Sequence, residues 1–183
     1  MDTTIDEFQA PDTLTPTDLG DHLARLVWES FSDFMAAGDA EISLAKLGVP
    51  TDDGVPPQHT VEEALIFLMW AHTRGAQLAF MGRAPDHLLH ETLDALHSAI
   101  FEDMATQGTP LVQLPLFEQR VSARYTEYNQ AAERSDAELG GRVAVHLVGS
   151  ATEHELATGL AERARAAANP LRDYLEEVEL VEA

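Results

Sequence analysis

The chain of 183 residues contains no cysteine and a single lysine. Without cysteine it forms no disulfides or thiolate metal sites, and it has no cysteine nucleophile. No basic, apolar leader opens the sequence, and the longest apolar run, residues 64–71, is too short to cross a membrane. We therefore expect a cytoplasmic protein that is neither exported nor embedded in a membrane.

Positive charge is scarce, because eleven Lys and Arg residues stand against 32 Asp and Glu, for a formal net charge of -21. At physiological salt this charge repels nucleic-acid phosphate and anionic lipid headgroups. We therefore expect no direct binding of nucleic acid and no membrane association. The same charge favours a basic protein partner, and it raises the hypothesis of an inhibitor that imitates nucleic acid.

Signals for β-strands are nearly absent. Apolar residues recur at every third or fourth position, and alternating stretches rich in β-branched residues are rare. The pattern predicts an all-α protein, a single compact bundle of seven or eight helices over residues 1–183. Residues 1–14 and 179–183 are expected to be acidic terminal segments, and the last residues are expected to fray.

Helix boundaries are predicted from capping residues, proline and glycine. The expected helices are 16–37, 39–47, 60–81, 85–106, 116–133, 152–169 and 173–178. Thr60 and Glu63 match a capping box at the start of the most apolar helix, which is expected at the centre of the bundle. Residues 139–149 stay open between helix and strand, because a Ser135–Glu138 helix-start signal is followed by two glycines and a valine-rich run.

The helix expected at 85–106 holds three of the eight histidines. His90, Asp94 and His97 form a ridge along one flank, where the i, i+3 spacing of the last two suits a shared metal ion. The chain offers no second such pair, no matching bridging carboxylates and no H-E-x-x-H motif. We expect a polar flank without a cofactor, and a divalent metal on this ridge is the alternative.

A second candidate is a pocket for an anion or another ligand. His72 lies on the apolar face of the 60–81 helix, so it is expected to be buried and to need a hydrogen-bond partner. On the 116–133 helix, Arg120 and Arg124 flank Tyr125 and Tyr128, an arrangement suited to a carboxylate or a phosphate. The alternative is a structural role, in which His72 and the tyrosines belong to the core and the arginines pair with acidic residues.

The opposite face of the 60–81 helix presents a conflict. Ile66 and Trp70 interrupt a polar strip, and Arg74 lies one turn from Trp70. Something must cover Trp70, either another helix of this chain, which we favour, or a second subunit, since aromatic residues and arginine are enriched at interfaces.

Catalytic signatures are missing, among them a phosphate-binding glycine loop and a G-x-S-x-G elbow. The leading hypothesis is a non-enzymatic helical interaction or regulatory protein, without a cofactor, that self-associates as a homo-oligomer or binds a protein partner. The alternative is a helical-bundle enzyme, either metal-dependent through the His/Asp ridge or binding a small molecule near His72. The acidic nucleic-acid mimic is the third.

Overall fold

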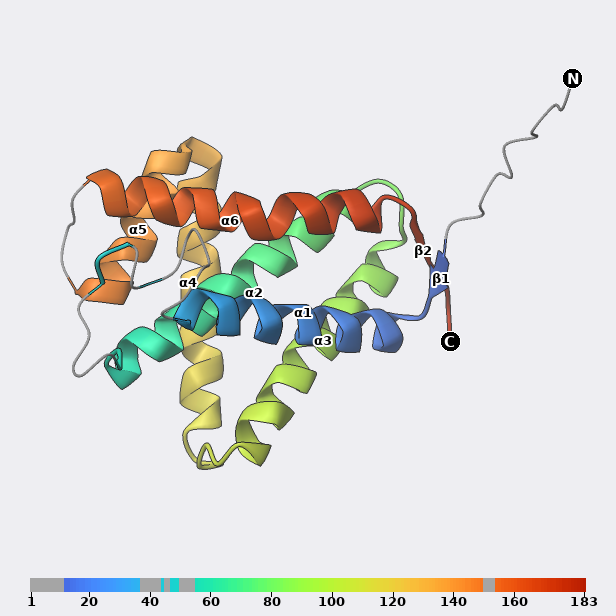
Figure 1. The fold of residues 1–183 in the computed structure, drawn as a ribbon. Coiled ribbons are helices and arrows are strands. Elements are labelled where there is room, and N and C mark those ends of the chain that lie inside the picture. The colour runs from blue at the N-terminus through green and yellow to red at the C-terminus, as the bar shows by residue number, and fades with distance from the viewer. Residues whose placement is uncertain (1–11, 37–43, 45–46, 50–54, 150–153) are drawn as a thin grey trace, which may run out of the picture.

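The computed structural model describes residues 12–36, 44, 47–49, 55–149 and 154–183. Its helices are α1 (Pro16–Met35), α2 (Gln58–Phe80), α3 (Asp86–Thr106), α4 (Leu114–Arg134), α5 (Asp136–Val148) and α6 (His154–Leu175). Two short strands, β1 (Asp12–Leu14) and β2 (Val178–Leu180), lie side by side (Figure 1). The predicted all-α class is confirmed for these residues, but their helices number six and not seven or eight.

The difference in helix number involves two predicted helices. The helix expected at 39–47 falls mostly outside the described residues. The break expected at Pro170 was wrong, because α6 continues through this proline and ends at Leu175. Pro170 removes one helical hydrogen bond, but Leu171 and Leu175 beyond it are buried, and this burial holds the last turn in place.

Helix α5 decides the alternative left open for 139–149 in favour of helix. Ser135 caps it, since its hydroxyl accepts a hydrogen bond of 3.1 Å from the Glu138 amide. Leu139, Val143 and Leu147 follow at helical spacing and are all buried. The helix ends where Gly149 adopts a φ of 77°, a conformation that glycine takes without steric cost.

The capping box predicted at the start of α2 was wrong. Helix α2 begins at Gln58, so Thr60 already lies inside it. The Thr60 hydroxyl donates a hydrogen bond of 2.9 Å to the Leu147 carbonyl of α5, and Glu63 is paired with Arg124 of α4. Contacts with other helices therefore take both side chains away from the role that the local pattern indicates.

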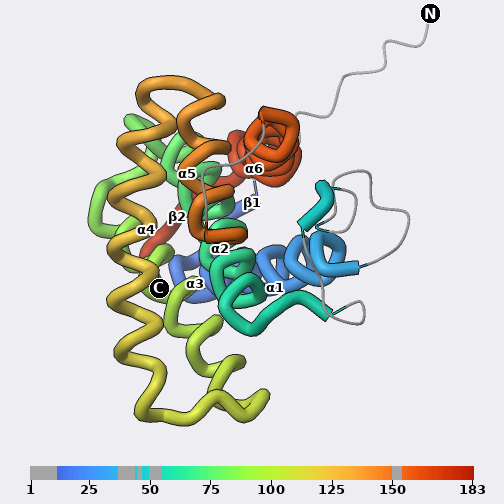
Figure 2. Tube along the Cα trace, turned by 90° about the vertical axis from the view of Figure 1, so that its left-hand side faces the viewer, coloured from blue at the N-terminus to red at the C-terminus, as the bar shows by residue number. Residues whose placement is uncertain are grey.

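Helix α2 lies at the centre of the fold, as its apolar sequence predicts. Every residue from Glu63 to Thr73 is buried. Helix α2 contacts all five other helices, and Figure 2 shows it with α4 on one side and α1 and α6 on the other. Helices α1 and α6 both contact α2, and Figure 1 shows α2 crossing behind the space between them.

The two strands join the ends of the described chain. β1 and β2 run parallel, with Leu14 opposite Leu180, so residues expected as a fraying tail form a paired strand. Nearby, the Arg83 guanidinium donates hydrogen bonds to the carbonyls of Ala79, Leu175 and Glu176, which fixes the end of α6 against α2. None of the described helices combines the length and the apolar character that crossing a membrane requires.

Candidate functional site

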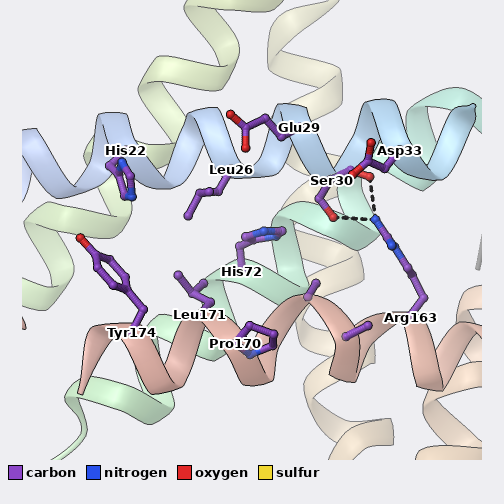
Figure 3. A pocket seen from close by; sticks show the side chains of 12 residues that line it. His22, Leu26, Glu29, Ser30, Asp33, His72, Arg163, Pro170, Leu171 and Tyr174 are labelled. Atoms are coloured by element: carbon purple, nitrogen blue, oxygen red, sulfur yellow. Dashed lines mark hydrogen bonds between the residues drawn. The ribbon is translucent and has the colours of Figure 1, made fainter. Parts of the chain in front are cut away.

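A cavity of about 420 Å³ lies between α1 and α6, with His72 of α2 between them (Figure 3). Its volume falls within the roughly 300–1,000 Å³ of small-molecule sites. Its polar side chains come from three helices and comprise His22, Glu29, Ser30, Asp33, His72, Arg163 and Tyr174. We call it the His72 cavity.

Helical spacing explains why α1 contributes most of these side chains. His22, Leu26, Glu29 and Asp33 recur at three and four positions, so they share one face of α1. The adjacent face, formed by Leu19, Leu23, Val27 and Phe34, is buried in the core. Burial of that apolar face fixes the rotation of α1 and directs its polar stripe toward α6.

His72 is the most buried polar side chain of the cavity, with 4% of its surface exposed. Its Nδ1 lies 2.8 Å from the Leu68 carbonyl. A carbonyl only accepts hydrogen bonds, so Nδ1 carries the proton, and Nε2 of the neutral ring has a free lone pair. Burial lowers the pKa of His72, an effect that the Leu68 hydrogen bond partly offsets and the Arg163 charge reinforces. Among the described residues, Nε2 has no hydrogen-bond partner.

Arg163 joins α6 to α1 at one end of the cavity. One guanidinium nitrogen donates hydrogen bonds of 2.8 and 2.9 Å to the carbonyl and hydroxyl of Ser30 (Figure 3). The guanidinium also lies over the Phe34 ring, 5.5 Å from its centroid. Burial lowers the pKa of Arg163, and the nearby Asp33 charge opposes this effect. Arg163 therefore has a structural task before any ligand binds.

The cavity also carries acceptor groups that are not matched by donors. Glu29 and Asp33 are exposed, and neither forms an ion pair within the part of the chain that the structure describes. Pro170 lines the cavity and has no N–H, so it leaves the Ala166 carbonyl, one turn earlier, without its usual helical donor. The acceptors at the cavity therefore include the His72 lone pair and two carboxylates, while on the donor side Arg163 Nε is buried without a partner among the described residues.

The predicted metal ridge does not come together as a cluster. His90 Nε2 lies 3.6 Å from Asp94, and both side chains are largely exposed. His97 turns inward, where Nδ1 lies 2.6 Å from the Leu93 carbonyl and Nε2 lies 2.8 Å from the Tyr125 hydroxyl. Within the described ranges, no group of three or more His, Asp or Glu side chains is placed to hold a metal ion.

The predicted arginine and tyrosine pocket is instead a polar layer between α2 and α4. Arg124 donates two hydrogen bonds of 2.9 Å to Glu63, which is fully buried, and this bonding raises the pKa of Arg124. Arg120 pairs with Glu62 at 2.5 Å. Both arginines are therefore occupied by carboxylates of α2, at a distance from the His72 cavity.

Tyr128 of this layer is fully buried and Tyr125 is partly buried, and desolvation raises the pKa of each hydroxyl. The Tyr125 hydroxyl lies 2.8 Å from His97 Nε2 and 3.3 Å from the Thr73 hydroxyl. The Tyr128 hydroxyl is buried and has no hydrogen-bond partner among the described residues. Neither tyrosine lines the His72 cavity.

The predicted interface residues are covered by the chain itself. Ile66 and Trp70 are buried, with 0% and 3% of their surfaces exposed. The Trp70 ring nitrogen donates a hydrogen bond of 2.8 Å to Asn129 of α4, and Arg74 lies over the indole at 5.9 Å. Another helix thus provides the cover that the sequence requires, and Trp70 offers no free surface to a second subunit.

Sequence reasoning singled out only His72 among the residues of this cavity. Ser30 and Arg163 are 133 positions apart, and no spacing rule links them. The single available signal was the polar stripe on α1, which resembles any solvated helix face. Comparison with protein-family models, curated proteins and solved structures finds no match for this chain.

Proposed function

We propose that this protein binds a small polar organic molecule in the His72 cavity. The observation that supports this proposal is the Nε2 lone pair of His72, which lines a cavity of ligand size with no described residue bonded to it. His72 Nε2 opens onto the cavity, since the fully buried side-chain atoms without a partner among the described residues are the Tyr128 hydroxyl and Arg163 Nε. A ligand in the cavity that donates a hydrogen bond to Nε2 gains about 0.5–1.5 kcal/mol from that bond.

The proposal is binding rather than catalysis. The Ser30 hydroxyl accepts a hydrogen bond from Arg163, and among the described residues neither it nor the Tyr174 hydroxyl is hydrogen-bonded to a cavity histidine. The described residues of the cavity therefore offer no paired nucleophile and base. The proposal keeps the small-molecule pocket near His72 from the alternative hypothesis, and it does not use the metal site on the His90, Asp94 and His97 ridge.

The test is a thermal-shift screen with small alcohols, amides, carboxylates and amines. Wild type is compared with His72→Leu and with His90→Leu, which removes an exposed imidazole outside the cavity. We expect a compound that raises the melting temperature of wild type and His90→Leu but not of His72→Leu. In wild type, the same compound should shift the ¹⁵N resonance of His72 Nε2. Equal stabilisation of all three proteins, with no resonance shift, would refute binding at this site.

A second candidate is self-association through the turn between α3 and α4. Leu111, Val112 and Leu116 expose 73%, 81% and 62% of their surfaces, although apolar side chains usually avoid such exposure. They lie within residues 104–117, the longest stretch of the chain without a charged residue. Two copies that each carry a charge of -21 repel one another least where their charges are absent. This turn thus supports the homo-oligomer hypothesis in place of Trp70.

Light scattering during size-exclusion chromatography tests the second candidate. We expect a dimer whose population rises with ionic strength, because salt screens the repulsion between copies. A variant with Leu111, Val112 and Leu116 all changed to serine should be monomeric. A wild-type protein that is monomeric at high concentration and high salt would contradict self-association.

A further inference from the structure

We infer that the ligand of the His72 cavity is a small organic amine that binds as an ammonium cation. This inference rests on the proposed binding function and specifies the chemical class of its ligand. It follows from the hydrogen-bonding character of the cavity wall, from its charge, and from the order in which its side chains lie.

The cavity presents acceptors where a ligand would make its polar contacts. His72 offers the Nε2 lone pair, and burial lowers its pKa, so it remains an acceptor at neutral pH. Glu29 and Asp33 add carboxylates. An ammonium group carries up to three donors and no acceptor, so it complements this set.

The charge of the cavity also favours an ammonium ligand. Glu29 and Asp33 lie on one face of α1 and form no ion pair among the described residues, although Asp33 is close enough to Arg163 for their charges to interact. Arg163 already bonds Ser30. A carboxylate or phosphate ligand would approach two like charges, in a chain whose net charge is -21. A cation is attracted by both the cavity and the whole molecule.

The arrangement in the cavity gives the amine an orientation. Figure 3 shows Glu29 and His72 in the middle of the view, Arg163 toward one end, and Tyr174 with His22 toward the other. The Arg163 charge also acts on His72, so the ammonium group is best placed beside Glu29, on the side of the cavity that leads toward Tyr174. The organic part then lies against Leu26, Leu171 and the Tyr174 ring, where apolar carbon is buried.

The experiment is isothermal titration calorimetry with three matched sets of compounds. The amines are benzylamine, 2-phenylethylamine and cyclohexylmethylamine, each compared with the alcohol and the carboxylate of the same carbon skeleton. We expect each amine to bind about tenfold more tightly than its alcohol, since the two exposed carboxylates Glu29 and Asp33 each attract it.

The matched variants separate the cavity charge from the net charge. Glu29→Gln with Asp33→Asn should abolish the preference for the amine and leave the affinity for the alcohol unchanged. Asp86→Asn with Glu91→Gln alters the net charge equally at exposed positions on α3, outside the cavity, and should keep the preference.

The possible outcomes distinguish this inference from the proposed function. If the alcohols or carboxylates bind as tightly as the amines, or the control variant loses the preference equally, the amine class is wrong and the binding site stands, provided that His72→Leu abolishes that binding. If no compound of any charge binds at millimolar concentration, the inference and the proposed function both fail.

Discussion

Replacing Arg124 with methionine removes the partner of a carboxylate at the centre of the fold. Glu63 has no exposed surface, and each of its carboxylate oxygens accepts a hydrogen bond of 2.9 Å from Arg124. Methionine is also long and unbranched, so the change removes the charge and its donors and retains most of the packing. The remaining carboxylate must then stay ionised without a partner or take up a proton.

The expected cost is large. Removing one partner of a buried ion pair typically destabilises a protein by about 3–5 kcal/mol. A domain of this kind has a total stability of about 5–15 kcal/mol, so the variant should lose a large part of it. Urea denaturation followed by far-ultraviolet circular dichroism measures this loss. Adding Glu63→Met should restore most of the stability, because an apolar pair can replace a buried ion pair at little cost.

Arg134→Met is the matched control. Arg134 pairs with Glu138 at 3.3 Å, and the two side chains are 66% and 48% exposed. An exposed ion pair contributes less than about 1 kcal/mol, so this variant should remain close to wild type. Equal losses for Arg124→Met and Arg134→Met would refute the reasoning, as would a double variant no more stable than Arg124→Met alone.

Three further predictions concern stability. Gly140→Ala should destabilise the protein, because a Cβ at that position collides with the α6 backbone. Gly141→Ala meets open space and should stabilise the protein by up to about 1 kcal/mol. Urea denaturation that ranks the two variants the other way would contradict the close α5–α6 contact. Burial lowers the pKa of His72 and His97 below the ordinary 6.5. As pH drops from about 7 to about 5, these histidines bind protons more readily in the unfolded chain than in the folded protein, so the free energy of unfolding should fall. Replacing both histidines with glutamine should flatten that dependence, and an unchanged slope would assign it to other groups. Tyr125→Phe leaves the His97 ring nitrogen without its hydrogen-bond donor and should lower the free energy of unfolding, measured by urea denaturation, by about 1–3 kcal/mol. A change within experimental error would show that the Tyr125 hydroxyl does not stabilise the fold.

The helices that sequence reasoning placed well are those with local start and stop signals. Thr15 and Ser135 cap α1 and α5 through hydrogen bonds to amides three residues later, as their sequence contexts indicate. Burial of His72 was also predictable, since it follows from the helical spacing of apolar residues around it. Each of these features depends on residues within a few turns of one another.

The errors arose where distant residues compete with a local signal. Thr60 and Glu63 have the residue types and spacing of a capping box. In the structure, however, the Thr60 hydroxyl bonds to the Leu147 carbonyl and Glu63 pairs with Arg124. Pro170 signals a helix end, but the buried side chain of Leu175 lies beyond it. Such outcomes depend on which helices pack together, and periodicity within one helix carries no information about that.

The candidate site was harder to predict than the fold for the same reason. Sequence reasoning placed Arg120 and Arg124 on one helix face, but it could not assign partners to them, because the chain holds 32 acidic residues. The structure selects Glu62 and Glu63. It also brings Arg163 to Ser30 across 133 positions, and this contact forms one end of a cavity that no sequence spacing indicates.

Because cationic residues are few in this chain, an unpaired carboxylate in the cavity does not by itself indicate a binding site. With 32 acidic residues and eleven Lys and Arg, most carboxylates in this chain have no cationic partner of their own, so an unpaired Glu29 or Asp33 is ordinary in itself. What distinguishes these two is the combination with His72, whose largely buried ring presents a lone pair to the same cavity. Exposed carboxylates are satisfied by water on all sides, whereas the His72 lone pair belongs to a ring that is only 4% exposed and faces the cavity. The case for a ligand therefore depends on His72, and Glu29 and Asp33 determine which charge that ligand carries.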